Sequence, residues 1–153
     1  MSVQIAIAGV SGRMGRALLE AVAADPACAL CAAIDRPGSP LAGQGAGAAW
    51  GGASNVRISD QPAVALQGAQ ALIDFTRPEA TAGYLDACVA AKVPLVIGTT
   101  GFDDAGKAHI AAAAQRIPIV FAPNMSVGVN LLMKLAGLAA HVLQDGYDSE
   151  ISG

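Results

Sequence analysis

Residues 3–15 of the chain read VQIAIAGVSGRMG, a short apolar run that enters a glycine-rich turn. Glycines stand at positions 9, 12 and 15, and a helical pattern runs from Gly12 to Ala24. In such a strand–turn–helix unit, one glycine permits the tight turn, one lets a phosphate approach the backbone, and one packs the helix on the strand. Unpaired N–H groups at the helix start also favour an anion. The stretch therefore predicts a pyrophosphate-binding turn, with Val10 where the commoner pattern has its first glycine.

An acidic and a basic residue follow the next apolar run, at the distance that such a turn requires. Asp35 lies 20 residues after Gly15, and Arg36 comes directly after it. A carboxylate at this place can accept both ribose hydroxyls of NAD, whereas a guanidinium can pair with the 2′-phosphate of NADP. The context favours dinucleotide binding over an ordinary surface pair, and we expect both NADH and NADPH to be accepted.

Apolar runs alternate with helical patterns along the chain. The expected strands are residues 3–8, 30–34, 56–59, 71–75, 93–97 and 117–121, with a further strand at 147–151. The expected helices are residues 12–24, 60–66, a segment from the capping-box pattern at 76–79 to about 91, 104–114 and 127–143. Residues 37–55 are expected to form a loop with room for a short helix. This alternation predicts an α/β fold of the Rossmann type, a doubly wound parallel sheet with helices on both faces.

Composition excludes several classes of protein. The chain has 153 residues, of which 54% are hydrophobic and 14% are charged, and its net charge is −3. This apolar content excludes a disordered chain, and no stretch reaches the roughly 18 uncharged apolar residues of a membrane span. The mildly acidic balance and the lack of a lysine–arginine cluster argue against nucleic-acid binding. Because the first residues do not form a signal peptide, we expect a cytoplasmic protein.

Two motifs that suggest other chemistry are rejected on their context. Cys28 and Cys31 form a C-x-x-C, but they lie in a strand pattern, where residues three apart point to opposite faces. We therefore expect three buried, reduced thiols and assign no metal site. Residues 101–107 have the glycine and lysine spacing of a P-loop, but Ala108 supplies no hydroxyl for Mg²⁺ and two aspartates would repel phosphate. We interpret this segment as a turn before a helix.

Three later segments lie at expected carboxyl ends of strands, where a doubly wound sheet binds its ligands. They read DFTRPE (74–79), GTTGF (98–102) and APNMSVGVN (122–130). Together with the glycine turn, they resemble the bacterial dihydrodipicolinate reductases, now called 4-hydroxy-tetrahydrodipicolinate reductases, over almost the whole chain. The resemblance implies NADH- or NADPH-dependent reduction of a cyclic dicarboxylate imine to tetrahydrodipicolinate, in lysine and diaminopimelate biosynthesis. It also implies a homotetramer.

The resemblance assigns roles along the cofactor. The glycine turn holds the pyrophosphate, Asp35 contacts the adenosine ribose, and Arg36 contacts NADP. The segment 98–100 lines the nicotinamide side, and Thr100 also lies near the substrate. Phe75 and Arg77 match residues near the cofactor, with a core side chain and a solvated charge as equally good interpretations. The expected cofactor-binding residues are Gly9, Val10, Ser11, Gly12, Arg13, Met14, Asp35, Arg36, Gly98, Thr99, Thr100, Ala122, Pro123, Asn124 and Met125.

The resembled family continues into a His-His-x-x-x-Lys segment that supplies a proton donor and a positive charge. This segment is not among residues 1–153, and His109 and His141 lie in helical patterns, so no catalytic residue is assigned. We expect a dinucleotide-binding domain at 1–125, and at 126–153 the first helix and strand of an α+β substrate and tetramerisation domain. Alone, the chain is expected to bind cofactor and turn over negligibly. The alternatives are a non-catalytic nucleotide-binding or regulatory module, and another Rossmann oxidoreductase for an amino-acid-derived substrate.

Overall fold

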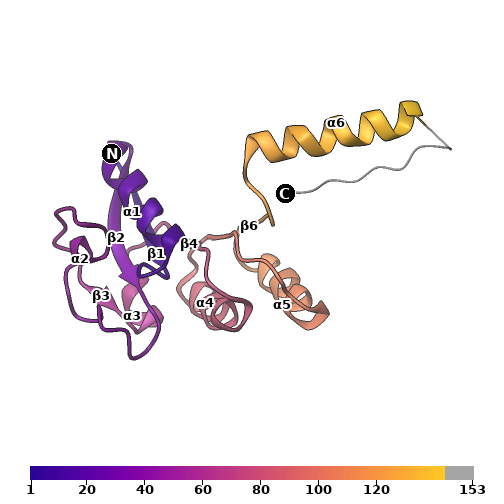
Figure 1. Ribbon diagram of the computed structural model, residues 1–153. Helices are drawn as coiled ribbons and strands as arrows, with labels where there is room; N and C mark the ends of the chain where they lie inside the picture. Colours follow the sequence, from indigo (N-terminus) through magenta and orange to yellow (C-terminus); the bar gives the residue numbers. More distant parts are fainter. Residues whose placement is uncertain (144–153) are drawn as a thin grey trace. The chain divides into compact units, whose positions relative to one another are not determined.

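The computed structural model describes residues 1–143, and the chain divides into two compact units. The first unit is Met1–Pro123, and the second begins at Asn124. This division falls two residues before the predicted domain boundary at residue 125. Figure 1 shows the sheet with its helices in the first unit and helix α6 (Val127–Leu143) in the second.

The first unit is built on a six-stranded parallel sheet, which confirms the predicted doubly wound α/β fold. The strand order is β3-β2-β1-β4-β5-β6, so the sheet grows in opposite directions from β1 and β4. At such a switch point, ligands bind beyond the carboxyl ends of the strands. The strands are β1 (Val3–Ala8), β2 (Cys28–Ile34), β3 (Ile58–Ser59), β4 (Ala71–Asp74), β5 (Leu95–Ile97) and β6 (Ile119–Phe121). The helices of this unit are α1 (Arg13–Ala24), α2 (Gly47–Trp50), α3 (Pro62–Ala65), α4 (Pro78–Ala91) and α5 (Asp104–Ala114).

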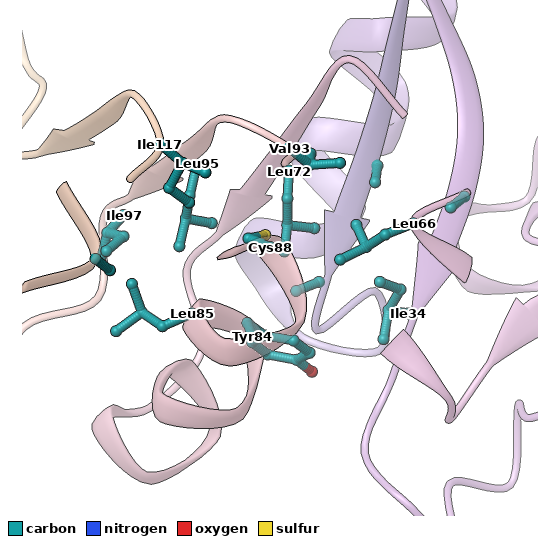
Figure 2. Packing of buried hydrophobic residues seen from close by; sticks show 14 of the residues in the cluster. Ile34, Leu66, Leu72, Tyr84, Leu85, Cys88, Val93, Leu95, Ile97 and Ile117 are labelled. Atoms are coloured by element: carbon teal, nitrogen blue, oxygen red, sulfur yellow. The ribbon is translucent and has the colours of Figure 1, made fainter. Parts of the chain in front are cut away.

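Each face of the sheet has its own apolar core. On one face, Leu19 and Val22 of α1 belong to a cluster with the strand residues Ile5 and Ile7. On the other face, residues of α4 and α5 share a cluster with residues of β4 and β5, and Figure 2 shows the α4 side chains beside those of the strands. The buried members labelled there include Leu72, Tyr84, Leu85, Cys88, Leu95 and Ile97. Burial on both faces explains why the strands read as continuous apolar runs rather than as alternating patterns.

Strand β2 is two residues longer than predicted and contains an irregularity. Ile5 of β1 lies opposite Leu30, but the next residue of β1 lies opposite Ala32, so Cys31 has no partner in the register. Cys28 packs against the core on the α1 side and Cys31 against the core on the α4 side, so the two thiols lie on opposite faces, as predicted. The expectation of three buried thiols is wrong for these two, which are only partly buried, and right for Cys88.

The start of α4 differs from the predicted capping box. The N-cap is Arg77 rather than Thr76, and no side chain caps the helix. The Thr76 hydroxyl and N–H instead both donate to Oδ1 of Asp74, at 2.6 and 2.9 Å. The buried carboxylate thus takes the donors of Thr76, and Pro78 begins the helix, where a residue without an N–H leaves no donor unpaired.

The bounds of three other strands differ from the predicted ones, and local contacts explain the differences. Strand β3 is short because residues 56 and 57 pair with the loop, through Ala46 N–H to Val56 O at 2.7 Å and a bridge between Gly45 and Arg57. Strands β5 and β6 begin only after Pro94 and Pro118, which have no N–H to donate. The P-loop-like segment is indeed a helix start, because Asp103 caps α5 by accepting from Gly106 N–H at 2.7 Å.

Helix α6 has the predicted bounds. The strand predicted at 147–151 lies outside the described residues. Among the residues that the structure describes, no helix combines the length and the apolar character needed to cross a membrane.

Candidate functional site

The glycine turn between β1 and α1 has steric reasons for its glycines. Gly9 has a φ of +70°, and a Cβ there would lie 2.6 Å from Cγ2 of Thr76. A Cβ on Gly15 would overlap the carbonyl oxygen of Gly9, because α1 packs directly on the turn. Gly12 is the N-cap of α1 and has no side chain to cap it. The turn therefore presents bare backbone at the carboxyl edge of the sheet.

The amides of this turn divide into used and free donors. The N–H groups of Gly9 and Val10 both donate to Ile34 O, at 2.8 and 3.2 Å. Within the described part of the chain, the N–H groups of Ser11, Arg13 and Met14 have no protein acceptor. The Val10 side chain is 0% exposed and belongs to the core. Val10, although predicted as a cofactor-binding residue, therefore offers a ligand neither its side chain nor a free N–H. The free donors are those at the start of α1, where the helix dipole favours an anion.

Asp35 stands beside the turn, at the end of β2, with its carboxylate largely enclosed. It is 4% exposed, and its Oδ2 accepts from the Ser39 hydroxyl at 2.6 Å. Its Oδ1 accepts from the Ser11 hydroxyl at 3.0 Å and from Arg36 N–H at 2.9 Å. A carboxylate has about four acceptor positions, so these donors leave one position for a ligand. To accept both ribose hydroxyls, as the sequence predicts, Asp35 needs one of its present donors to turn away.

These groups border a cleft of about 320 Å³ at the carboxyl edge. Asp35 and Arg36 line it from the end of β2, and Phe75 and Arg77 line it from the segment after β4. A neighbouring hollow of about 430 Å³ shares Asp35 and Arg36 and continues between α3 and α4. The cleft lining is Gly9, Ser11, Gly12, Asp35, Arg36, Phe75, Thr76, Arg77, Ala80 and Tyr84. The structure thus brings the turn, the β2 acid–base pair and the β4 loop together.

The segment after β5 lies behind Phe75. A Cβ on Gly98 would overlap the Phe75 ring, so the ring rests directly on the Gly98 backbone. Phe75 is partly buried, belongs to neither apolar core cluster and lines the cleft, so its role toward a cofactor stays a prediction. Arg77 is exposed at the start of α4 and lines the cleft as well, and Thr100 is exposed.

Thr99 points away from solvent. It is 3% exposed, and its hydroxyl lies 3.3 Å from the hydroxyl of Thr81, which donates to Oδ2 of Asp74 at 2.6 Å. Asp74 is 0% exposed and ends β4. The Thr99 hydroxyl is therefore engaged in this buried network, and Thr99 is not among the residues that line the cleft. Sequence reasoning missed the network, since a strand-end aspartate followed seven residues later by a threonine is a weak signal.

The last four predicted cofactor residues straddle the division between the two units. Ala122 and Pro123 end the first unit, where the N–H of Ala122 donates to Ile97 O at 3.2 Å. Asn124 and Met125 begin the second unit, where Oδ1 of Asn124 accepts from Ser126 N–H at 2.8 Å. Their role toward a cofactor stays a prediction.

Two further titratable groups lie on α4. Tyr84 is 6% exposed and lines both hollows, and burial, with the charges of Asp74 and Asp35, raises its pKa to about 12. Burial and the charge of Asp74 raise the pKa of the Cys88 thiol to about 12 as well. Both groups are neutral at physiological pH, so neither offers an anion that would repel a phosphate.

Of the two histidines, His109 belongs to the first unit and is not among the residues that line the cleft. His109 on α5 is partly buried, with its Nε2 3.0 Å from Oδ1 of Asp86 on α4, and His141 is exposed on α6. Over residues 1–143, no group of three or more potential metal ligands comes together. The cleft lining contains no histidine.

The chain was compared with known protein families, curated proteins and solved structures. The family described as "Dihydrodipicolinate reductase, N-terminus" matches residues 3–125. The 4-hydroxy-tetrahydrodipicolinate reductase of Thiobacillus denitrificans is 75% identical over 99% of this chain and 57% of the relative, and that of Laribacter hongkongensis is 60% identical over 97% and 55%. A solved structure, dipicolinate-bound dihydrodipicolinate reductase from Paenisporosarcina sp. TG-14, matches with a TM-score of 0.74 and 27% identity, over 92% of this chain and 54% of that one.

The chain spans a little over half the length of the curated relatives that it matches. The matched segment holds the glycine turn, both buried aspartates and the loops after β4 and β5. Because the family profile covers residues 3–125, well over half of the sequence, this chain belongs to the dihydrodipicolinate reductase family through that family's N-terminal domain.

Proposed function

We propose that this chain is the cofactor-binding part of an NAD(P)H-dependent reductase that converts 4-hydroxy-tetrahydrodipicolinate to tetrahydrodipicolinate in lysine and diaminopimelate biosynthesis. The observation that carries the proposal is the buried Asp35 carboxylate beside an uncapped helix start, both on one cleft. Family membership supports a nicotinamide cofactor, and the names of the relatives support the substrate. Site geometry and family thus point to the same chemistry.

The residues of the cleft fit the two ends of an adenosine diphosphate group. The free N–H groups of Ser11, Arg13 and Met14 would hold the pyrophosphate, at a place where any Cβ on Gly15 would overlap the turn. The open acceptor position of Asp35 would take a ribose hydroxyl, and the second hydroxyl would displace the Ser11 donor, whose bond at 3.0 Å is longer than that of Ser39. The proposed fit therefore calls for rotation of the Ser11 side chain.

Arg36 and Asp35 together support acceptance of both cofactors. Arg36 is exposed on the rim of the cleft, where its guanidinium can pair with a 2′-phosphate. Asp35 supplies the acceptor that an unphosphorylated ribose needs. We propose that the chain binds NADPH and NADH with affinities that differ by less than a hundredfold.

The bound nicotinamide would supply the hydride for reduction. In this chain, the Phe75 ring and the backbone of Gly98 would form a wall beside the cofactor, and Thr100 would offer its exposed hydroxyl toward the substrate. Among the described side chains that line the cleft, we assign no proton donor. Tyr84 has a pKa of about 12 and therefore releases its proton too reluctantly near neutral pH. We therefore propose that the chain alone turns over negligibly. A homotetramer and a cytoplasmic location are expectations that rest on the resemblance.

Calorimetric titration of the chain with NADPH and NADH tests the proposal. We expect saturable binding of both, and a loss of at least tenfold for both in Asp35→Ala, because the variant removes the ribose acceptor. Absence of binding to the unmodified chain, or equal binding by the variant, would contradict it.

A turnover assay separates the reductase part from a non-catalytic binding or regulatory module. The chain is mixed with fresh 4-hydroxy-tetrahydrodipicolinate and NADPH, and absorbance of the reduced cofactor is followed. Robust oxidation by residues 1–153 alone would disprove the proposed inactivity. The reductase assignment is supported if the chain binds cofactor without turnover, and if turnover appears once the remaining part of a relative is fused after residue 153. If the fusion shows no turnover either, the binding module is favoured.

A further inference from the structure

The buried Asp74 carboxylate is the centre of a polar network that the binding chemistry does not use. All of its described partners are donors: the N–H and hydroxyl of Thr76 on Oδ1, and the hydroxyl of Thr81 on Oδ2. Asp74 is 0% exposed and is not among the residues lining the cleft. A buried carboxylate surrounded by donors acts as a fixed acceptor, and its partners take their orientation from it.

The hydroxyl groups of this network donate in one direction, toward the Asp74 carboxylate. Thr81 has one hydroxyl hydrogen, and the bond to Asp74, at 2.6 Å, is shorter than its contacts with Arg77 O at 3.1 Å and with the Thr99 hydroxyl at 3.3 Å. When Thr81 donates to the carboxylate, its oxygen is free to accept from Thr99. The order is therefore Thr99 to Thr81 to Asp74, from the β5 segment through α4 to the end of β4.

This order ties the segment after β5 to the end of β4. Gly98 N–H donates to Asp74 O at 2.9 Å, and among the described residues the Thr81 contact is the one side-chain hydrogen bond that reaches residues 98–101. The same segment carries the Phe75 ring on the backbone of Gly98. In a doubly wound fold the second nucleotide half of the cofactor lies over this side of the switch point, opposite the acid of β2.

We propose that Thr81 is a positioning residue for the nicotinamide half of the cleft: its hydroxyl joins Asp74 to Thr99 and so fixes the segment 98–100 against Phe75. Thr81 is 0% exposed, so it acts through its neighbours and touches no ligand. The inference rests on the proposed function, because it needs the cleft to hold a dinucleotide. It assigns the adenosine half to Asp35 and Ser39, whereas the side-chain hydrogen bonds of Thr81 within residues 1–143 go to Asp74, Arg77 and Thr99.

The test compares NADPH with 2′,5′-ADP, which has the adenosine half but lacks the nicotinamide half. Titration calorimetry is run on the chain and on Thr81→Val, which keeps the shape of the side chain and removes its hydroxyl. We expect the affinity for NADPH to fall at least tenfold and that for 2′,5′-ADP to change less than twofold. Thr81→Ser restores the hydroxyl and should restore NADPH binding.

Two more variants separate positioning from a general loss of structure. Thr99→Val leaves the bond between Thr81 and Asp74 in place and should show the same selective loss for NADPH, even if Thr81→Val folds poorly. Ser39→Ala should weaken both ligands alike, because Ser39 holds the Asp35 carboxylate. Equal losses for both ligands in Thr81→Val and Thr99→Val, or no loss in either variant, would overturn the positioning role while the proposed function stands. If the unmodified chain binds neither ligand, both fail.

Discussion

Two buried aspartates end neighbouring halves of the sheet, and they differ in what surrounds them. Asp35 directly follows β2 and Asp74 is the last residue of β4, and they are 4% and 0% exposed. Each accepts from two hydroxyls and one N–H. Asp35, however, lines the cleft, whereas Asp74 is enclosed by Thr76 and Thr81. Similar hydrogen-bond counts therefore accompany two different environments.

The difference lies in the mobility of the donors. Ser11 lies on the cleft, in the turn before α1, where its hydroxyl can rotate toward solvent or a ligand, whereas Ser39 is 7% exposed. Thr81 lies inside α4 and is 0% exposed, so its hydroxyl has no such alternative. One carboxylate can therefore exchange partners with a ligand, while the other can only hold the protein together.

The largest expected effect tests whether the Asp35 side depends on its backbone. In Gly15→Ala, the added Cβ would overlap the carbonyl oxygen of Gly9 and lie 2.7 Å from Cα of Val10, and neither backbone atom can rotate away. We expect the free energy of unfolding to fall by at least about 3 kcal/mol, together with loss of NADPH binding. Urea unfolding followed by circular dichroism measures the change.

Gly83→Ala is the matched control, because Gly83 lies inside α4 with no heavy atom within 4 Å of an added Cβ. There the same substitution should stabilise the chain by about 0.5–1 kcal/mol through helix propensity. Equal changes in the free energy of unfolding at the two glycines would show that the close packing of α1 on the turn does not contribute to stability.

The second prediction contrasts the aspartates directly. Asp74→Ala removes the acceptor of the buried Thr81 hydroxyl and of the Thr76 hydroxyl and N–H, and we expect a loss of about 2–3 kcal/mol in the free energy of unfolding. Asp35→Ala should lose less, about 1–2 kcal/mol, because Asp35 lines the open cleft, so that water can bond to Ser11 in its place and only the buried Ser39 hydroxyl loses its acceptor. Urea unfolding with parallel NADPH titration checks both. Greater destabilisation by Asp35→Ala than by Asp74→Ala would reverse the comparison.

The third prediction concerns Arg36, which lies next to Asp35 in the sequence and has no counterpart beside Asp74. Arg36→Ala should weaken NADPH binding about tenfold, or about 1.4 kcal/mol, and change NADH binding less than twofold, because only NADPH carries the 2′-phosphate. Arg116→Ala, an exposed arginine after α5, is the charge-matched control and should change neither affinity. Fluorescence titration of the reduced cofactors measures both. A parallel loss for NADH would show that Arg36 contacts a part common to both cofactors.

The Asp35 region was predictable because its signal is local in the sequence. Glycines at fixed spacing and an acid 20 residues after Gly15 are dictated by the backbone path of one strand–turn–helix–strand unit. The sheet and helix α6 followed from apolar runs and helical spacing, which depend on neighbouring residues alone.

The Asp74 region was not predictable, because its partners come from separate elements. Thr81 and Thr99 meet only after α4 folds across β4 and β5, and nothing in the pattern places their hydroxyls together. The failure of the capping box has the same origin: Thr76 looked like a helix cap, but the buried carboxylate two residues earlier takes its donors. Buried polar groups compete for local donors, so a capping pattern next to one is unreliable.

The smallest effect concerns how far the charge of Asp74 reaches along α4. Burial, and secondly the charge of Asp74, raise the pKa of the Cys88 thiol from 9.0 to about 12. The unfolded chain therefore loses this proton at a lower pH than the folded chain. The contribution to stability is complete below pH 9 and is lost as the pH rises toward 12. Between pH 8 and pH 10 we expect a loss of about 1 kcal/mol, read from urea midpoints at each pH.

Cys88→Ala should remove most of this pH dependence, at the expense of lower stability at every pH because a buried side chain is shortened. Tyr84→Phe should leave most of it in place, since the tyrosine pKa rises from 10.0 to about 12 and its contribution is lost mainly above pH 10. Because Asp74 acts on both groups and Asp35 on Tyr84, Asp74→Asn should flatten the Cys88 profile more than Asp35→Asn does. An unchanged slope in Cys88→Ala would assign the alkaline loss to other groups and confine the influence of Asp74 to its hydrogen-bond partners.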